Sequence, residues 1–186
     1  MKLLSVRTIP KVQIPVMEVH GQPSLEIERR FLVKELPDNL EQYLHEDIVQ
    51  GYLSTEEGTS IRLRHQGDNY YQTIKKGTGK IREEIEIPIS KPMYDILWNE
   101  TKGRRIKKTR YEIPDGENII QLDIYSGKKL KGLETVEVEF KSIEECDNFT
   151  PCEWFGAEVT EIKEFTNKQL ATHGIPEKLL KQLRKK

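Results

Sequence analysis

The sequence has few of the residues that build disulfide frameworks or zinc sites. Its 186 residues include only two cysteines, Cys146 and Cys152, and four histidines. The histidines are scattered and no Cys/His motif is present, which argues against a zinc site. A disulfide between the two cysteines is geometrically possible, but one pair in an otherwise Cys-free chain is a weak secretory signal. We therefore expect free thiols.

Long hydrophobic runs and an excess of charge of one sign are also missing. No apolar run is long enough to span a membrane, and Arg7, Pro10 and Lys11 interrupt any signal-like segment near the start. The formal net charge is −1, from 30 Lys plus Arg and 31 Asp plus Glu, which argues against a general nucleic-acid binder. We expect a cytoplasmic protein with no membrane and no nucleic-acid partner, and leave open a monomer or a homodimer.

The composition is polar, with 33% charged and 35% hydrophobic residues. The length suits one domain with a real core, but few apolar side chains are left to fill an interior. Residues 1–23 carry three prolines and no clear period, so we expect an extended or poorly ordered leader. The main domain is predicted over residues 24–174, followed by a basic, helical C-terminal tail over 175–186.

From Leu25 onward, alternating polar and apolar residues predict a series of strands separated by turn sequences such as Pro114-Asp115-Gly116. Helices are predicted at Pro37–Leu44, Lys91–Thr101 and about Lys163–Thr172, with a loop around Trp154 and Gly156. Eight mostly antiparallel strands fit either a sandwich or a closed barrel. The predicted strands are Leu25–Val33, Asp47–Ser54, Thr59–His65, Asn69–Lys76, Ile81–Ile89, Arg104–Glu112, Glu117–Tyr125 and Leu133–Phe140.

One face of the predicted strands repeatedly carries charged residues at positions i and i+2. Since side chains alternate along a strand, each such set shares one face. The opposite face is apolar, and we expect the helices to cover it. A closed sheet would turn the charged face into a lumen. The charged set is Glu26, Glu28, Arg30, Arg62, Arg64, Lys75, Arg82, Glu84, Glu86, Lys108, Arg110, Asp123, Glu137 and Glu139.

A charged strand face is often only a solvated face, and a single pair of this kind means little. Here the pattern runs over seven strands, and like charges two residues apart repel each other. Carboxylates without imidazole or thiolate partners suit hard cations such as Mg²⁺ or Mn²⁺. Clustered Arg and Lys suit phosphate oxygens. Together they indicate a metal–polyphosphate site and phosphoryl transfer to water.

Short motifs follow one another along residues 25 to about 174. They are Glu26-Ile27-Glu28-Arg29-Arg30, Gln50-Gly51-Tyr52-Leu53, Ile61-Arg62-Leu63-Arg64, Thr73-Ile74-Lys75, Glu84-Ile85-Glu86-Ile87-Pro88, Lys108-Thr109-Arg110-Tyr111, Leu122-Asp123, Gly132-Leu133, Glu137-Val138-Glu139 and Trp154 to Thr160. These motifs and their order resemble those of the CYTH superfamily, the triphosphate tunnel metalloenzymes, and in particular its short bacterial members.

The resemblance implies a mainly β (α+β) fold, a closed eight-stranded antiparallel β-barrel or tunnel with flanking helices and a C-terminal closing helix. It also implies that Arg30, Arg62, Arg64, Lys75, Lys108 and Arg110 bind the triphosphate. Glu26, Glu28, Glu137 and Glu139 would hold Mg²⁺ or Mn²⁺ and orient the attacking water. Possible further members are Arg82, Glu84, Glu86, Asp123 and Lys163.

The sequence departs from the family pattern in two places. Arg30 stands where the family has Lys, which keeps the charge but cannot readily donate a proton. The closing segment normally has an Asp and an Arg before an aromatic residue, whereas here only Phe165 and Asn167 remain, with Lys163 as a substitute for the lost positive charge. The lysine-rich loop at 128–131 is either a solvated loop or an electrostatic funnel for polyanions.

The sequence thus predicts a metal-dependent triphosphatase with inorganic tripolyphosphate as its substrate. Class IV adenylyl cyclase and thiamine triphosphatase are enzyme alternatives on the same scaffold. A non-catalytic polyphosphate- or nucleotide-binding module is a third alternative, to which the changes at Arg30 and in the closing segment give weight. A plain β-barrel interaction protein is the fourth.

Overall fold

A computed structural model describes residues 22–54 and 56–183 of the chain. Most of the predicted leader and the last three residues of the predicted tail lie outside these ranges. Among the described helices, none is long and apolar enough to cross a membrane.

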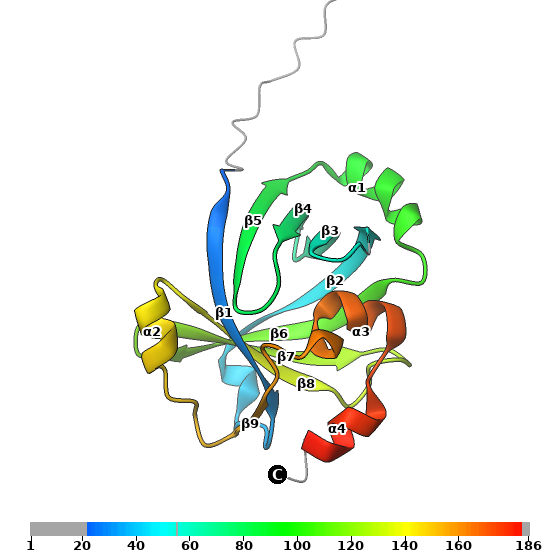
Figure 1. The fold of residues 1–186 in the computed structure, drawn as a ribbon. Coiled ribbons are helices and arrows are strands. Elements are labelled where there is room, and N and C mark those ends of the chain that lie inside the picture. The colour runs from blue at the N-terminus through cyan, green and yellow to red at the C-terminus, as the bar shows by residue number, and fades with distance from the viewer. Residues whose placement is uncertain (1–21, 55, 184–186) are drawn as a thin grey trace, which may run out of the picture.

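Eight antiparallel strands within the described ranges close into a barrel (Figure 1). The order around the barrel is β5-β4-β3-β2-β6-β7-β8-β1, and β1 pairs back with β5. The prediction of a closed antiparallel barrel rather than a sandwich is confirmed. The strands are β1 (Ser24–Val33), β2 (Leu44–Ser54), β3 (Thr59–Gln66), β4 (Asn69–Lys76), β5 (Ile81–Pro88), β6 (Arg105–Asp115), β7 (Asn118–Ser126) and β8 (Glu134–Phe140).

Strand β1 changes partner along one of its edges. Its first half, Ser24 to Ile27, pairs with β5, whereas Phe31 and Val33 pair with a ninth strand, β9 (Phe155–Glu158). Between the two halves, the backbone N–H of Arg30 donates to the Thr160 hydroxyl at 3.0 Å. The barrel wall therefore has a seam beside the middle of β1, where the C-terminal segment replaces β5.

The helices differ from prediction at several points. The helix predicted at Pro37–Leu44 is wrong, since only the short 3₁₀ turn η1 (Leu40–Gln42) forms there and Leu44 already belongs to β2. Asn39 adopts a left-handed φ of 55°, which prevents a regular helix from starting earlier. The loop predicted around Gly156 contains β9, and the sequence reading missed α2 (Ile143–Asn148).

The other predicted helices form with shorter bounds. Ser90 caps α1 (Lys91–Trp98) by accepting from the Met93 N–H, and η2 (Asn99–Thr101) continues it. The closing segment divides into η3 (Lys163–Phe165) and α3 (Asn167–His173), and the tail contains α4 (Glu177–Leu183).

Two apolar clusters lie on opposite sides of the barrel wall. The outer cluster includes Val136 and Val138 of β8, and it is covered by α2 and by Phe149 and Phe155. The plug cluster fills one end of the barrel, where Leu32, Tyr52 and Ile106 of the strands meet side chains of the closing segment and α4. Those side chains are Phe165, Leu170, Ala171 and Leu180. The apolar strand face predicted from sequence is buried at Leu63, Leu122 and Val136, whereas Leu25 near the start of β1 is 72% exposed.

Candidate active site

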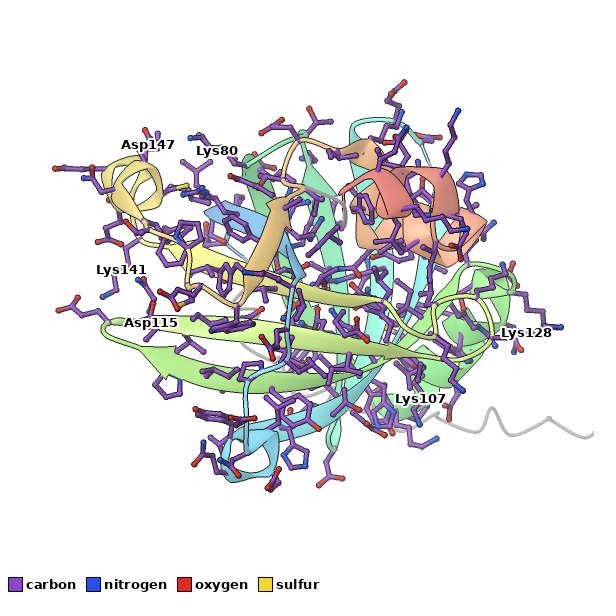
Figure 2. The ribbon with its side chains drawn as sticks, turned by 90° about the horizontal axis from the view of Figure 1, so that it is seen from below. Lys80, Lys107, Asp115, Lys128, Lys141 and Asp147 are labelled. Atoms are coloured by element: carbon purple, nitrogen blue, oxygen red, sulfur yellow. The ribbon has the colours of Figure 1, made fainter. Side chains whose placement is uncertain are left out.

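The charged strand face predicted from sequence lies inside the barrel. Glu28, Arg30, Lys108, Asp123 and Glu137 are all buried, which is rare for charged residues unless they are paired. Other charged residues lie on the outer surface. Figure 2 shows Lys80, Lys107, Asp115, Lys128, Lys141 and Asp147 at the periphery of the molecule.

An acidic cluster forms where β1 and β8 lie side by side. Glu28 stands directly opposite Glu139 in the register of the two strands, and Glu26 points to the same face. Carboxylate oxygens of these three residues lie within 4.8 Å of one another. Like charges at opposite positions of a sheet repel. Two effects raise the pKa of Glu139 above its ordinary value. The larger is burial, and the second is the negative charge of Glu26.

Two basic side chains from neighbouring strands partly neutralise the acidic cluster. Lys75 of β4 forms an ion pair with Glu26 and a second one with Glu84 at 2.7 Å. Arg82 of β5 contacts Glu26 at 2.9 Å and Glu28 at 2.6 Å. Neither of these basic residues forms an ion pair with Glu139 among the described residues, so Glu139 is the least neutralised member of the cluster.

Glu137 was predicted to join the metal-binding acids, but the structure surrounds it with basic groups. Arg30 and Arg110 bind its two carboxylate oxygens at 2.8 and 2.7 Å. Burial would raise the pKa of Glu137, but the positive charges of Arg30, Lys108 and Arg110 outweigh burial and hold it well below the usual range. Glu137 does not belong to the acidic cluster, and its position is that of a carboxylate that orients two arginines.

Arg30 contacts several groups at once. Besides Glu137, its guanidinium binds Glu28 at 2.8 Å and donates to the Phe165 carbonyl oxygen of the closing segment at 3.4 Å. The donors of a lysine all sit on one nitrogen, whereas the planar guanidinium of Arg30 presents donors to three separate acceptors. The substitution noted in the sequence therefore joins the acidic cluster to the closing segment.

Asp123 is fully buried on β7 and organises the next two basic residues. Arg110 binds it through two parallel hydrogen bonds of 2.7 Å, the strong geometry for a guanidinium and a carboxylate. Lys108 forms an ion pair with the same carboxylate. Burial and the nearby Arg110 lower the pKa of Lys108 to about 8.

Arg62 and Arg64 of β3 share Glu86 of β5 as a carboxylate partner. Arg64 lies 2.6 Å from Glu86, whereas Arg62 lies 3.7 Å away. Burial and the positive charge of Arg62 lower the pKa of Arg64. Within residues 22–54 and 56–183, Nε of Arg64 is the one buried side-chain nitrogen or oxygen that lacks a hydrogen-bond partner. Such an unsatisfied donor is costly and marks a place for an acceptor.

Two cavities that share some lining residues take up this interior. The seam cavity, of about 360 Å³, opens between the barrel and the closing segment. The tunnel cavity, of about 280 Å³, lies inside the barrel and is almost entirely polar. Arg62, Lys75 and Glu137 line both cavities. Glu28 faces the seam cavity whereas Glu26 and Glu139 face the tunnel cavity, so the acidic cluster contributes to the walls of both cavities.

Some lining residues were missed by the sequence reading. Tyr52 is buried and accepts a hydrogen bond from Gln50 at 3.1 Å. Asn167 of α3 donates to Glu137 at 3.3 Å and accepts from the Tyr125 hydroxyl at 2.7 Å. Neutral side chains such as these give no charge pattern. Lys163 lines the seam cavity but is 61% exposed and pairs with Glu57 at 2.5 Å, so it does not replace a cation inside the tunnel.

A closed antiparallel barrel whose interior is lined by interlocked acids and bases defines the chain as a tunnel protein. Comparison with known proteins identifies the family. The chain belongs to the CYTH domain family, whose sequence model matches residues 24–150.

Individual relatives agree with the family assignment. The chain is 45% identical over 150 residues to a protein of Nitrosomonas europaea named inorganic triphosphatase, a match that covers 78% of this chain and 96% of that protein. A second protein of that name, from Acetivibrio thermocellus, is 28% identical over 78% of this chain and 92% of its own length. A crystal structure described as an inorganic triphosphatase superposes with a TM-score of 0.60 at 41% identity, over 81% of this chain and 96% of the other.

Proposed function

We propose that this protein is a metal-dependent inorganic triphosphatase that hydrolyses tripolyphosphate to pyrophosphate and orthophosphate inside its tunnel. The observation that carries the proposal is the cluster of Glu26, Glu28 and Glu139 in the walls of two cavities that are also lined with arginine and lysine. The 45% identity to a protein named inorganic triphosphatase supports the same reaction and substrate.

The residues present fit a hard divalent cation, and we propose Mg²⁺ or Mn²⁺. Glu26, Glu28 and Glu139 offer only carboxylate oxygens, which these ions prefer. Among the described residues Glu139 forms no ion pair, and burial together with the negative charge of Glu26 raises its pKa. A bound divalent ion would compensate this negative charge and would draw negative charge from the phosphoryl oxygens in the transition state.

The basic residues are proposed to hold the triphosphate. Arg62, Arg64 and Lys75 face the tunnel cavity together with Lys108 and Arg110. Arg30 and Arg82 face the seam cavity. Nε of Arg64 has no hydrogen-bond partner among the residues that the structure describes. A phosphate oxygen of a bound triphosphate would supply the missing acceptor. The carboxylates Glu84, Glu86, Asp123 and Glu137 then fix the directions of these cations.

The proposed reaction is attack of water on a terminal phosphorus, with pyrophosphate as the leaving group. Positioning and charge neutralisation supply most of the rate in such reactions. The arginines and lysines are already fixed by ion pairs before substrate binds, so little reorganisation is needed as charge develops. The acidic cluster is the group of carboxylates that can orient the attacking water, and the geometry does not single out one of its members as a base.

The test is a phosphate-release assay with tripolyphosphate, ATP and pyrophosphate, each with and without Mg²⁺ or Mn²⁺. We expect metal-dependent release with tripolyphosphate as the best substrate. Cyclic AMP formed from ATP without orthophosphate would instead indicate a cyclase. Tight binding of tripolyphosphate without release, in the presence of either metal, would indicate a binding module.

A matched pair of variants locates the activity. Glu28→Gln removes one carboxylate of the acidic cluster on the inner face. Glu83→Gln removes a carboxylate on the outer face of β5, where Glu83 pairs with Lys76 at 3.0 Å. We expect Glu28→Gln to abolish release and Glu83→Gln to leave it unchanged. Equal activity in both variants would mean that the site is placed wrongly.

A further inference from the structure

Lys168, the second residue of α3, lies at the wall of the seam cavity. Its ammonium group donates hydrogen bonds to two backbone carbonyl oxygens, that of Glu56 between β2 and β3 at 2.6 Å and that of Thr59 at the start of β3 at 3.1 Å. An ammonium group has three N–H donors, so these bonds leave one donor unused. The two carbonyl groups fix the position of the ammonium but do not neutralise its charge.

The charge of Lys168 stays largely uncompensated. Over the described ranges, Lys168 takes part in no ion pair, whereas its neighbour Lys163 pairs with Glu57 at 2.5 Å. Burial lowers the pKa of Lys168, and the positive charge of Lys163 adds to this effect. A partly buried ammonium group that is held in place but not paired is suited to an anionic ligand.

Two basic residues that line the seam cavity, Arg62 and Lys75, indicate which kind of anion would reach Lys168. Arg62 and Lys75 line both cavities, while Lys168 lines only the seam cavity. A chain of phosphates held by Arg62 and Lys75 can therefore extend from the tunnel cavity toward α3. Hydroxyl groups of Thr59, Ser60 and Thr160 line the same space.

We propose that Lys168 is a further substrate-binding residue that contacts the phosphoryl group lying in the seam cavity and thereby favours triphosphate over diphosphate. This inference rests on the proposed triphosphatase function. A pyrophosphate held by Arg62 and Lys75 is one phosphoryl group shorter and does not need the contact. Lys168 thus contributes to selection for chain length.

The test compares Lys168→Gln with the unmodified protein. The amide keeps donors for the carbonyl oxygens but removes the charge. We expect the KM for tripolyphosphate to rise about tenfold, as for loss of one hydrogen bond between charged groups, while kcat changes by less than about twofold. The inhibition constant of pyrophosphate should change by less than about twofold as well. The control is Lys91→Gln, which removes an exposed ammonium from an i,i+4 pair on α1.

A second variant separates binding from a purely structural role. Glu57→Gln removes the carboxylate that pairs with Lys163 and so makes the seam cavity more positive. It should lower the KM for tripolyphosphate, most clearly at low salt. A structural role of these contacts would instead predict weaker binding in both Glu57→Gln and Lys168→Gln.

An unchanged KM in Lys168→Gln, or an equal loss for tripolyphosphate and pyrophosphate, would overturn the inference while leaving the triphosphatase function intact. If the unmodified protein releases no phosphate, calorimetric titration with tripolyphosphate in the presence of Mg²⁺ replaces KM with a dissociation constant. The same tenfold weakening in Lys168→Gln is then expected, and no difference would contradict the inference.

Discussion

Two carboxylates on the same face of the same strand, Glu137 and Glu139, lie in opposite electrostatic environments. Glu137 is enclosed by Arg30, Lys108 and Arg110, which hold its pKa well below the usual range. Glu139 lies beside Glu26 and Glu28, and burial together with Glu26 raises its pKa. A displacement of two residues along β8 thus moves from a basic region of the tunnel to an acidic one.

The comparison distinguishes carboxylates that hold basic side chains in place from carboxylates that are available to a ligand. In the basic region each carboxylate is matched by a guanidinium, so the charges are satisfied within the protein itself. In the acidic region three carboxylates converge with incomplete neutralisation, which the protein tolerates at a cost in stability. Incompletely paired negative charge is thus retained where a cation is expected to bind.

The largest expected effect follows from removing the incompletely paired charge. Glu139→Gln should lower kcat/KM for tripolyphosphate by about 10²–10³-fold, since one element of transition-state charge stabilisation is lost. The same variant should unfold at an equal or higher temperature without metal, because repulsion within the acidic cluster is relieved. Phosphate release and thermal unfolding are the two measurements. A variant that is both inactive and strongly destabilised would mean that Glu139 has a structural role.

The reverse pattern is expected for Glu137→Gln. Removing the charge leaves Arg30 and Arg110 without a shared buried partner, so the free energy of unfolding should fall by about 3 kcal/mol. Denaturant unfolding measures this. Glu117→Gln is the control, because Glu117 is highly exposed and pairs with Lys141 only on the surface. Equal stability of Glu137→Gln and the unmodified protein would show that the basic region does not depend on this carboxylate.

The pH dependence of stability should have opposite signs at the two positions. A lowered pKa means that Glu137 stabilises the fold above the ordinary carboxyl pKa of 4.5 and that this contribution is lost as pH falls toward its folded value. The difference between the unmodified protein and Glu137→Gln should therefore shrink below that pH. Glu139 has a raised pKa, so the unmodified protein should lose stability relative to Glu139→Gln as pH rises through it. Denaturant unfolding without metal at several pH values checks both signs, and parallel curves would contradict them.

A smaller effect is expected at Arg30, which connects the two regions. Arg30→Lys keeps the charge but cannot contact Glu28, Glu137 and the Phe165 carbonyl oxygen together. We expect a loss of about 1 kcal/mol in the free energy of unfolding, the value of one hydrogen bond. Chemical denaturation of the two proteins provides the comparison. No loss would mean that a lysine can serve all three acceptors.

The alternation along the strands was enough to predict the inner face of the site, whereas the closed barrel was predicted from the family resemblance. Glu28 and Glu139 point inward because side chains alternate along a strand, and that rule is local. The pairing of Glu28 with Glu139 depends on the register between β1 and β8, which alternation does not determine. The family resemblance grouped Glu137 with the metal-binding acids, whereas the register places Arg30 opposite Glu137.

The closing segment was the least predictable part. Strand β9 is only four residues long, and its pairing with β1 is a long-range contact. Lys168 drew no attention in the sequence because it stands in a helix among ordinary polar residues. Its significance comes from two backbone carbonyl oxygens more than one hundred positions earlier.

Calorimetric titration with Mn²⁺ tests most directly whether the acidic region binds a divalent cation. The unmodified protein and Glu83→Gln should both show saturable binding, and Glu139→Gln should show none at the same concentrations. Undiminished Mn²⁺ binding by Glu139→Gln, or no binding by the unmodified protein, would contradict this assignment of the acidic cluster.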